Sequence, residues 1–180
     1  KLHKANLLVV GLGGVGSFAA EFLARAGIGK MTIVDGDTVD LTNINRQLPA
    51  LTSTVGKAKV EVVDARLLDI NPELKLTQLN QFLNPEDMET VFDDQTYDYV
   101  LDCIDSVSPK VTLIMNARRR KVKIVSCMGA GGKMNPSKVL VRDIHKTQSC
   151  HLAKQVRKRL KKENIDKGIR CVFSTEIQDE

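Results

Sequence analysis

A glycine-rich turn near the start of the chain has the spacing of a nucleotide-binding loop. It reads Gly11-Leu12-Gly13-Gly14-Val15-Gly16 and follows the apolar run 5–10. In such a turn the first glycine permits the tight bend, the second lets backbone N–H groups approach phosphate, and the third lets the helix pack close to the sheet. The N-terminus of the next helix adds N–H groups and a partial positive charge. These residues predict a site for the phosphates of a nucleotide.

A carboxylate follows at the distance where such a site binds the ribose. Asp35 lies 19 residues after Gly16 and ends the apolar run 30–34. An acidic residue about 20 residues after the glycine turn typically accepts hydrogen bonds from ribose hydroxyls. This pattern predicts nucleotide binding but does not say which nucleotide is bound.

Further polar residues favour a nucleoside triphosphate over a nicotinamide cofactor. Asn43 and Arg46 lie in the polar loop 42–47, and Lys59 opens the next helix. Cations near the glycine loop suit the charge of a triphosphate. Asp105 lies where ligands of parallel sheets bind, and its carboxylate could hold Mg²⁺ that bridges phosphate oxygens. Two alternatives stay open: Asp105 as a charge or cap at a helix N-terminus, and Lys59 as a surface residue of an amphipathic helix.

The segments that must position these residues alternate between strand and helix patterns. We expect strands at 5–10, 30–34, 74–79, 97–103, 122–128, 139–141 and 171–173, and helices at 17–26, 56–71, from 84–87 onward, 108–121 and 150–163. This alternation predicts an α/β fold, a Rossmann-like, mostly parallel sheet with helices on both faces. No linker or repeat divides the chain. We therefore expect residues 1–180 to form a single nucleotide-binding adenylating domain, an excerpt of a longer chain.

The composition is that of an ordinary globular protein. Hydrophobic residues make up 42% and charged residues 27% of the chain, which is too apolar for a disordered protein. No apolar run reaches the roughly 18 residues of a membrane span. The cysteines form no CxxC pair, which argues against a zinc ribbon. We expect a cytoplasmic protein with no membrane span in this segment.

The net charge of +5 conceals an asymmetry between two parts of the chain. Residues 1–109 carry 9 basic and 16 acidic side chains, whereas residues 110–170 carry 18 basic and 3 acidic ones. A basic region attached to an acidic one predicts a surface that meets a polyanion. A solvated helical face rich in Lys and Arg explains the same composition, so charge alone leaves both interpretations open.

Together these motifs resemble the ubiquitin-activating-enzyme-like superfamily of ATP-dependent adenylating enzymes. The resembling segments are GLGGVG at 11–16, DGD at 35–37, TNINRQ at 42–47, VGKAK at 55–59 and LDCIDS at 101–106. The resemblance implies that the nucleotide is ATP and that Asp35 holds its ribose, beside the glycines Gly11, Gly13, Gly14 and Gly16. It further implies that Asn43, Arg46 and Lys59 contact the phosphates. Asp105 would assist a magnesium-dependent adenylation as the metal ligand.

The last third of the chain is similar to the tRNA threonylcarbamoyladenosine dehydratase branch of that superfamily. The resembling segments are 129–147, 152–162 and 171–176. The resemblance implies ATP-dependent activation of the threonyl carboxylate of a modified adenosine in the tRNA anticodon loop, followed by dehydrative cyclisation. No covalent protein nucleophile is needed for that chemistry. One departure is Cys150-His151, where the family pattern has Asp-Pro, so the turn before the basic helix is expected to differ.

The resemblance also implies partners. A tRNA would meet the basic segment, including Arg118, Arg119, Arg120, Arg157 and Arg159. A homodimer is expected, with the segment 129–132 and the strand 139–141 near its interface. The alternative function is adenylation of the C-terminal glycine of a ubiquitin-like sulfur-carrier protein, in which case a sulfur-relay or carrier protein is the partner.

Overall fold

The apolar runs pair into one sheet, in which all neighbouring strands but one pair are parallel. The computed structural model describes residues 1–93 and 95–177. Its strands are β1 (Asn6–Val10), β2 (Lys30–Val34), β3 (Lys75–Leu79), β4 (Tyr99–Asp102), β5 (Lys123–Cys127), β6 (Val139–Asp143) and β7 (Arg170–Ser174). They lie in the order β3-β2-β1-β4-β5-β7-β6, and only β6 and β7 pair antiparallel among the described strands. The predicted mostly parallel, Rossmann-like α/β fold is confirmed.

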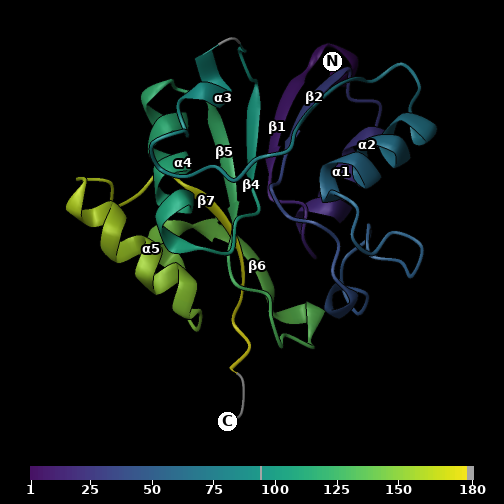
Figure 1. The fold of residues 1–180 in the computed structure, drawn as a ribbon. Coiled ribbons are helices and arrows are strands. Elements are labelled where there is room, and N and C mark those ends of the chain that lie inside the picture. Colours follow the sequence, from purple (N-terminus) through teal and green to yellow (C-terminus); the bar gives the residue numbers. More distant parts are fainter. Residues whose placement is uncertain (94, 178–180) are drawn as a thin grey trace.

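Helices cover both faces of this sheet. They are α1 (Gly16–Arg25), α2 (Lys59–Ile70), α3 (Thr90–Asp93), α4 (Val107–Arg119) and α5 (His151–Lys162), with short 3-10 turns at Leu2–Lys4, Leu41–Asn43, Pro136–Lys138 and Ile144–Lys146. Helices α1 and α2 lie on one face, and α3, α4 and α5 lie on the other (Figure 1). Within residues 1–93 and 95–177, no helix has the length and apolar character needed to cross a membrane.

The central strand β1 shows why its residues from Leu7 to Val10 are all apolar. Successive strand residues point to opposite faces. Leu7 and Val9 therefore pack in the layer with α1 and α2, while Leu8 and Val10 pack in the layer with α4 and α5. Because both faces are covered, every position of the strand favours an apolar side chain.

The helix expected to open at Asn84-Pro85-Glu86-Asp87 begins later, so this prediction was wrong in its start. Residues 84–90 form tight turns, in which the Asp87 N–H donates to the Asn84 carbonyl at 3.1 Å and the Thr90 N–H donates to the Asp87 carbonyl at 3.1 Å. The Thr90 hydroxyl also donates to the Asp87 carbonyl, at 2.7 Å. An α-helix through this segment would need that carbonyl for the N–H four residues on. Helix α3 therefore spans only Thr90–Asp93.

Cys150, which stands where the family pattern has Asp, caps the N-terminus of α5. It is the N-cap residue of the helix, and its Sγ accepts the Ala153 N–H at 3.5 Å. His151 is the first helical residue, is exposed, and contacts Gln155 one turn later at 3.4 Å. Both residues thus have structural roles at the start of the basic helix.

A buried ion pair joins α4 to the ends of β4 and β5. Lys110 and Asp102 are fully buried, and the Lys110 Nζ lies 2.9 Å from Asp102 Oδ2. The ammonium also donates to the Cys127 carbonyl at 2.8 Å, and the Ser126 hydroxyl donates to Asp102 Oδ2 at 2.5 Å. The remaining carboxylate oxygen, Oδ1, accepts the Ile104 N–H at 3.1 Å. Both charges are therefore paired and hydrogen-bonded, as buried charges require.

Replacing Lys110 with Met should destabilise the protein by about 3–5 kcal/mol, because it leaves the Asp102 carboxylate buried without its counter-charge. Chemical denaturation of the Lys110→Met variant measures this loss. The exposed Lys154 on α5 is the matched control, and Lys154→Met should change stability by no more than about 0.5 kcal/mol. Adding Asp102→Asn to Lys110→Met should restore part of the loss. Equal losses in the single and double variants would show that the unpaired charge is not the cause.

Candidate nucleotide-binding site

The glycine turn connects β1 to α1 at the carboxyl edge of the sheet. Gly11 has a φ of +89°, and a Cβ on it would lie 2.8 Å from the Cys103 carbonyl oxygen. A Cβ on Gly16 would overlap the Gly11 carbonyl. A larger residue at either position would therefore push the turn away from β4 or from its own helix. The two glycines permit the close backbone approach that the sequence predicts.

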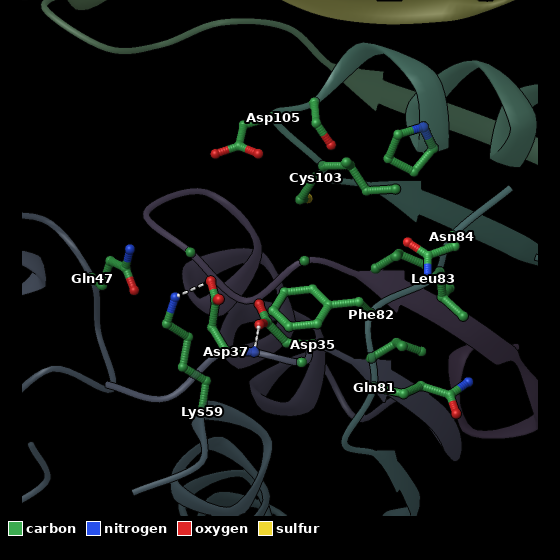
Figure 2. Close-up of a pocket in the computed structure, with 18 residues that line it drawn as sticks. Asp35, Asp37, Gln47, Lys59, Gln81, Phe82, Leu83, Asn84, Cys103 and Asp105 are labelled. Carbon is green, nitrogen blue, oxygen red and sulfur yellow. Dashed lines mark hydrogen bonds and ion pairs between the residues drawn. The ribbon is translucent and has the colours of Figure 1, made fainter. Parts of the chain in front are cut away.

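This turn forms one wall of a cavity of about 300 Å³ (Figure 2). Gly11 and Gly13 line it, whereas Gly14 and Gly16 are not among its lining residues. The other walls come from the end of β2, from Gln47 and Lys59, from the loop 81–84, and from residues 103–106 with Pro109. The cavity thus lies at the carboxyl ends of β1, β2 and β4, where ligands of parallel sheets bind.

Asp35 lies at the base of the cavity and fixes the glycine turn. Its Oδ2 accepts the Leu12 N–H at 2.6 Å. Its Oδ1 accepts the Asp37 N–H at 2.8 Å (Figure 2). Each carboxylate oxygen has a further lone pair. The carboxylate can therefore hold the loop and still accept hydrogen bonds from ribose hydroxyls.

Lys59 reaches the cavity from the first turn of α2, and its side chain is only 5% exposed. The interpretation of Lys59 as a surface residue is therefore wrong. Its Nζ lies 2.8 Å from Asp37 Oδ2, and the Asp37 side chain is 53% exposed (Figure 2). The Lys59 N–H also donates to the Asp37 carbonyl at 3.0 Å, which holds the start of α2 beside the end of β2. The lysine is thus positioned at the site with a carboxylate as its present partner.

Arg46 and Asn43 do not line the cavity in this structure. The Arg46 guanidinium is exposed and donates to the Thr42 carbonyl at 3.0 Å and to Asn45 Oδ1 at 2.8 Å. Its stem lies against Gly14, since a Cβ there would be 3.5 Å from Arg46 Cγ. Asn43 is buried and forms a capping box with Asp40 around the turn Leu41–Asn43. Arg46 is therefore beside the glycine turn and Asn43 supports its loop.

Gln47 is a site residue that the motif contained without an assigned role. It lines the cavity, and a Cβ on Gly13 would lie 3.7 Å from its Nε2. Its Oε1 is buried and has no hydrogen-bond partner among residues 1–93 and 95–177. A buried acceptor without a partner is costly, unless a ligand supplies the donor. Gln47 thus marks a position where a hydroxyl or amino group of a ligand would fit.

The loop 81–84 supplies an apolar wall that sequence motifs did not reveal. Phe82 lines the cavity although the residue is 62% exposed. A Cβ on Gly36 would lie 2.6 Å from the Phe82 N atom, so the glycine between the two aspartates of the DGD motif is what lets this loop approach. An exposed aromatic ring at a cavity wall suits a planar base.

Asp105 lines the cavity opposite Lys59, and it is exposed (Figure 2). It is not the helix cap, because the N-cap residue of α4 is Ser106. Within the part of the chain that the structure describes, no group of three or more His, Cys, Asp or Glu residues could hold a metal alone. Mg²⁺ commonly uses one or two carboxylates together with substrate phosphates and water. The single carboxylate of Asp105 fits a metal ion that arrives on a nucleotide.

Comparisons with known proteins show the family to which the chain belongs. Residues 1–174 match the ThiF family. The chain is 46% identical over 175 residues to a tRNA threonylcarbamoyladenosine dehydratase of Bacillus subtilis, which covers 97% of the chain and 68% of that relative. It is 38% identical over 125 residues to a molybdopterin-synthase adenylyltransferase of Escherichia coli, which covers 69% of the chain and 49% of that relative.

Solved structures of a related enzyme have the same fold. The tRNA N6-threonylcarbamoyladenosine dehydratase of E. coli in complex with ATP has a TM-score of 0.93 at 45% identity, over 98% of this chain and 75% of that one. The complex of the same enzyme with AMP has a TM-score of 0.94 at 44% identity, over 99% of this chain and 75% of that one. The chain therefore belongs to the ThiF family and, within it, to the tRNA threonylcarbamoyladenosine dehydratases.

Proposed function

We propose that this chain is the nucleotide-binding adenylating domain of an ATP-dependent tRNA threonylcarbamoyladenosine dehydratase. It would activate the threonyl carboxylate of threonylcarbamoyladenosine in tRNA with ATP, and the activated group would then cyclise. The observation that carries the proposal is the convergence of Gly11, Asp35, Lys59 and Asp105 on one cavity at the carboxyl edge of the sheet. The similarity to dehydratases over nearly the whole chain favours this substrate over a carrier protein.

The charges of the cavity support a requirement for a divalent cation. Its lining contains three carboxylates, those of Asp35, Asp37 and Asp105, and one ammonium, that of Lys59. That ammonium is already paired with Asp37. A triphosphate brings further negative charge, which this lining would repel unless cations compensate it. Mg²⁺ bound to the phosphates and held by Asp105 would supply that compensation and stabilise charge on the phosphate oxygens.

In the proposed mechanism the chain mainly binds and orients the reactants. Asp35 would accept hydrogen bonds from the ribose, and the loop 81–84 would contact the base. The N–H groups of the glycine turn and the Lys59 ammonium would stabilise the charge that develops at the α-phosphate. A carboxylate oxygen of the substrate attacks the α-phosphorus and pyrophosphate leaves. A nucleophile on the same substrate then closes the ring and releases AMP, so no protein nucleophile is required.

The Arg46 guanidinium would contact the phosphates after a change of its side-chain conformation. Its stem already lies beside Gly14, while its guanidinium donates only to neighbours in the exposed loop, Thr42 and Asn45. Exchanging these partners for phosphate oxygens would replace neutral acceptors with charged ones, which form stronger hydrogen bonds.

The exposed face of α5 supports tRNA as the polyanionic partner. The helix buries Ala153, Val156 and Leu160 and exposes a series of cations, which are Lys154, Lys158, Arg159, Lys161 and Lys162. Two of the other arginines named from the sequence already have partners within the protein. Arg157 is half-buried and donates to the Thr147 carbonyl at 2.7 Å. The Arg120 guanidinium lies 3.4 Å from the Asp93 carboxylate. The lysines of α5 are thus better placed than these arginines to contact phosphates.

A cytoplasmic homodimer is part of the proposal. The strand β6 is at the edge of the sheet, where unpaired backbone groups favour association. It exposes Val139 and Val141, and the preceding loop exposes Met134. This apolar edge supports the dimer interface expected near residues 139–141. A sulfur-relay or carrier protein is the alternative partner, since an acidic surface would also be attracted to the lysines of α5.

The substrate decides between the two functions. With the full-length protein, ATP and Mg²⁺, pyrophosphate release should require tRNA that contains threonylcarbamoyladenosine, and unmodified tRNA should be inactive. A small carrier protein ending in Gly-Gly should give no stimulation. Pyrophosphate release stimulated by the carrier but not by the modified tRNA would reject the proposed substrate.

Binding of ATP should depend on Mg²⁺ more strongly than binding of AMP. Chelation should weaken ATP binding at least about tenfold, because the acidic lining repels an uncompensated triphosphate. AMP, which carries less charge, should lose less than about threefold. Calorimetric titration with and without a chelator measures both. Asp105→Asn should reduce the effect of Mg²⁺ on ATP binding, and equal ATP affinity in both conditions would contradict the proposed role of the metal.

Replacing Lys59 or Arg46 with Ala should lower the rate of pyrophosphate release about a hundredfold, as for other groups that stabilise charge in a transition state. The exposed Lys57, two residues before Lys59, is the matched control, and Lys57→Ala should retain activity. Thermal unfolding of each variant separates catalysis from stability. Loss of the folded state in Lys59→Ala, or full activity in either variant, would contradict these placements.

A further inference from the structure

Two cysteine side chains lie side by side at the carboxyl ends of β4 and β5. In this parallel pair Asp102 is opposite Ser126, so the next residues, Cys103 and Cys127, are also opposite each other. The Ser126 hydroxyl touches the Asp102 carboxylate on one face of the sheet. Because successive side chains alternate between faces, both cysteines point to the other face. The two cysteine side chains are therefore cross-strand neighbours on that face.

The surroundings favour the reactive form of the Cys127 thiol. The neighbouring Cys103 side chain, with the Lys110 ammonium nearby, lowers the pKa of Cys127. The thiolate is the form that reacts with oxidants. Cys127 is thus suited to react first, and Cys103, its neighbour on the adjacent strand, is placed to resolve the product.

Both thiols border space that a small oxidant can enter. Cys127 is partly exposed and lines a second cavity, of about 450 Å³, between the segment 128–136 and β7. Cys103 is also partly exposed and lines the nucleotide cavity, as Figure 2 shows. Hydrogen peroxide, which is little larger than water, can therefore reach the pair from the nucleotide cavity, which contains no residue of the edge strand β6 proposed as the dimer interface.

We propose that Cys103 and Cys127 form a reversible disulfide that switches off nucleotide binding. The Cys127 thiolate attacks hydrogen peroxide, which gives a sulfenic acid and releases hydroxide. The Cys103 sulfur then attacks the sulfenic sulfur. The S–S bond forms, and the departing hydroxide takes the Cys103 proton as water. Two thiols are oxidised and one peroxide is reduced to two waters, and a dithiol reductant reverses the change.

The position of the pair links this bond to the nucleotide site. Paired strands are about 4.8 Å apart, whereas the Cβ atoms of a disulfide are about 3.5–4.5 Å apart. Closing the bond must therefore draw the ends of the two strands together. The Cys103 carbonyl lies directly against Gly11, with no room for a Cβ between them, and Cys103 N–H donates to Val10 at 2.9 Å. A shift of Cys103 therefore moves the glycine turn that would hold the phosphates.

The other two cysteines do not share this arrangement. Cys171 is opposite Ser126 on β7, so its side chain points to the face away from Cys127. Burial raises the pKa of Cys171 to about 12, which keeps it in the unreactive thiol form. Cys150 lies before α5 and caps that helix. The disulfide is therefore expected to be specific for one pair.

Peptide mapping after peroxide treatment tests the bond directly. The full-length protein is treated with hydrogen peroxide, its remaining thiols are alkylated, and the digest is analysed by mass spectrometry. We expect one cross-linked peptide pair that contains Cys103 and Cys127, abolished by dithiothreitol. ATP bound with Mg²⁺ should slow its formation. This readout does not depend on the proposed function, so it remains decisive even if the protein has no tRNA substrate.

Nucleotide affinity tests the switch. Oxidation should weaken ATP binding about tenfold to a hundredfold, since displacements near 1 Å in a binding site have effects of that size, and reduction should restore it. Cys127→Ser, which lies outside the nucleotide cavity, should bind ATP normally and be insensitive to peroxide. Cys150→Ser is the matched control and should stay sensitive. A cross-link that leaves ATP affinity unchanged, oxidation of Cys127 without a cross-link, or peroxide sensitivity of Cys127→Ser would overturn the proposal.

Discussion

At the carboxyl edge of the sheet, the backbone of Gly11 lies against the carbonyl group of Cys103, and Gly16 lies against Gly11, with no room for side chains between them. This contact joins the turn after β1 to the loop after β4. The first lines the cavity with Gly11 and Gly13, and the second lines it with Asp105. Because two backbones are in direct contact, neither can shift alone. The separation between the phosphate-facing turn and the carboxylate that would hold the metal is therefore set by the backbone, not by flexible side chains.

On the opposite face of the sheet, a buried ion pair fixes the ends of β4 and β5. Asp102 and Lys110 are buried at a desolvation cost that an apolar pair would avoid. The Asp102 carboxylate accepts hydrogen bonds from three donors in different segments, namely Lys110, Ser126 and the Ile104 N–H. Ile104 lies one residue before Asp105. The buried pair thus determines the course of the loop that enters the cavity. The same two strand ends carry Cys103 and Cys127, which explains why oxidation there would reach the nucleotide site.

The features that the sequence predicts well are those with a local cause. Continuous apolar runs mark strands covered on both faces, and the glycine turn and Asp35 follow from spacing along one βαβ unit. The ion-pair partner of Lys59 could not be predicted from the sequence. Asp37 is 22 residues away along the chain, and only the folded loop brings the two side chains together. The path of the loop 40–47 likewise determines that Asn43 forms a capping box and that the Arg46 side chain points away from the cavity, and this path could not be predicted from the sequence. The wall at Phe82 could not be predicted from the motif, because only the fold shows that a Cβ on Gly36 would lie 2.6 Å from the Phe82 N atom.

The two halves of the charge asymmetry lie on different parts of the fold and suit different anions. The nucleotide cavity is acidic, so it selects an anion that brings its own divalent cation. The face of α5 is basic and exposed, so it suits a polyanion whose bound counterions can be released. Helix α5 begins beside Gly129, just after the end of β5, since a Cβ on Gly129 would lie 3.8 Å from both Cys150 Sγ and Leu152 Cβ. The first turn of α5 therefore lies at the same edge of the sheet as the cavity, and the later cations, from Lys158 to Lys162, lie farther along the helix. A polyanion that lay along α5 would thus reach this edge of the sheet at the start of the helix.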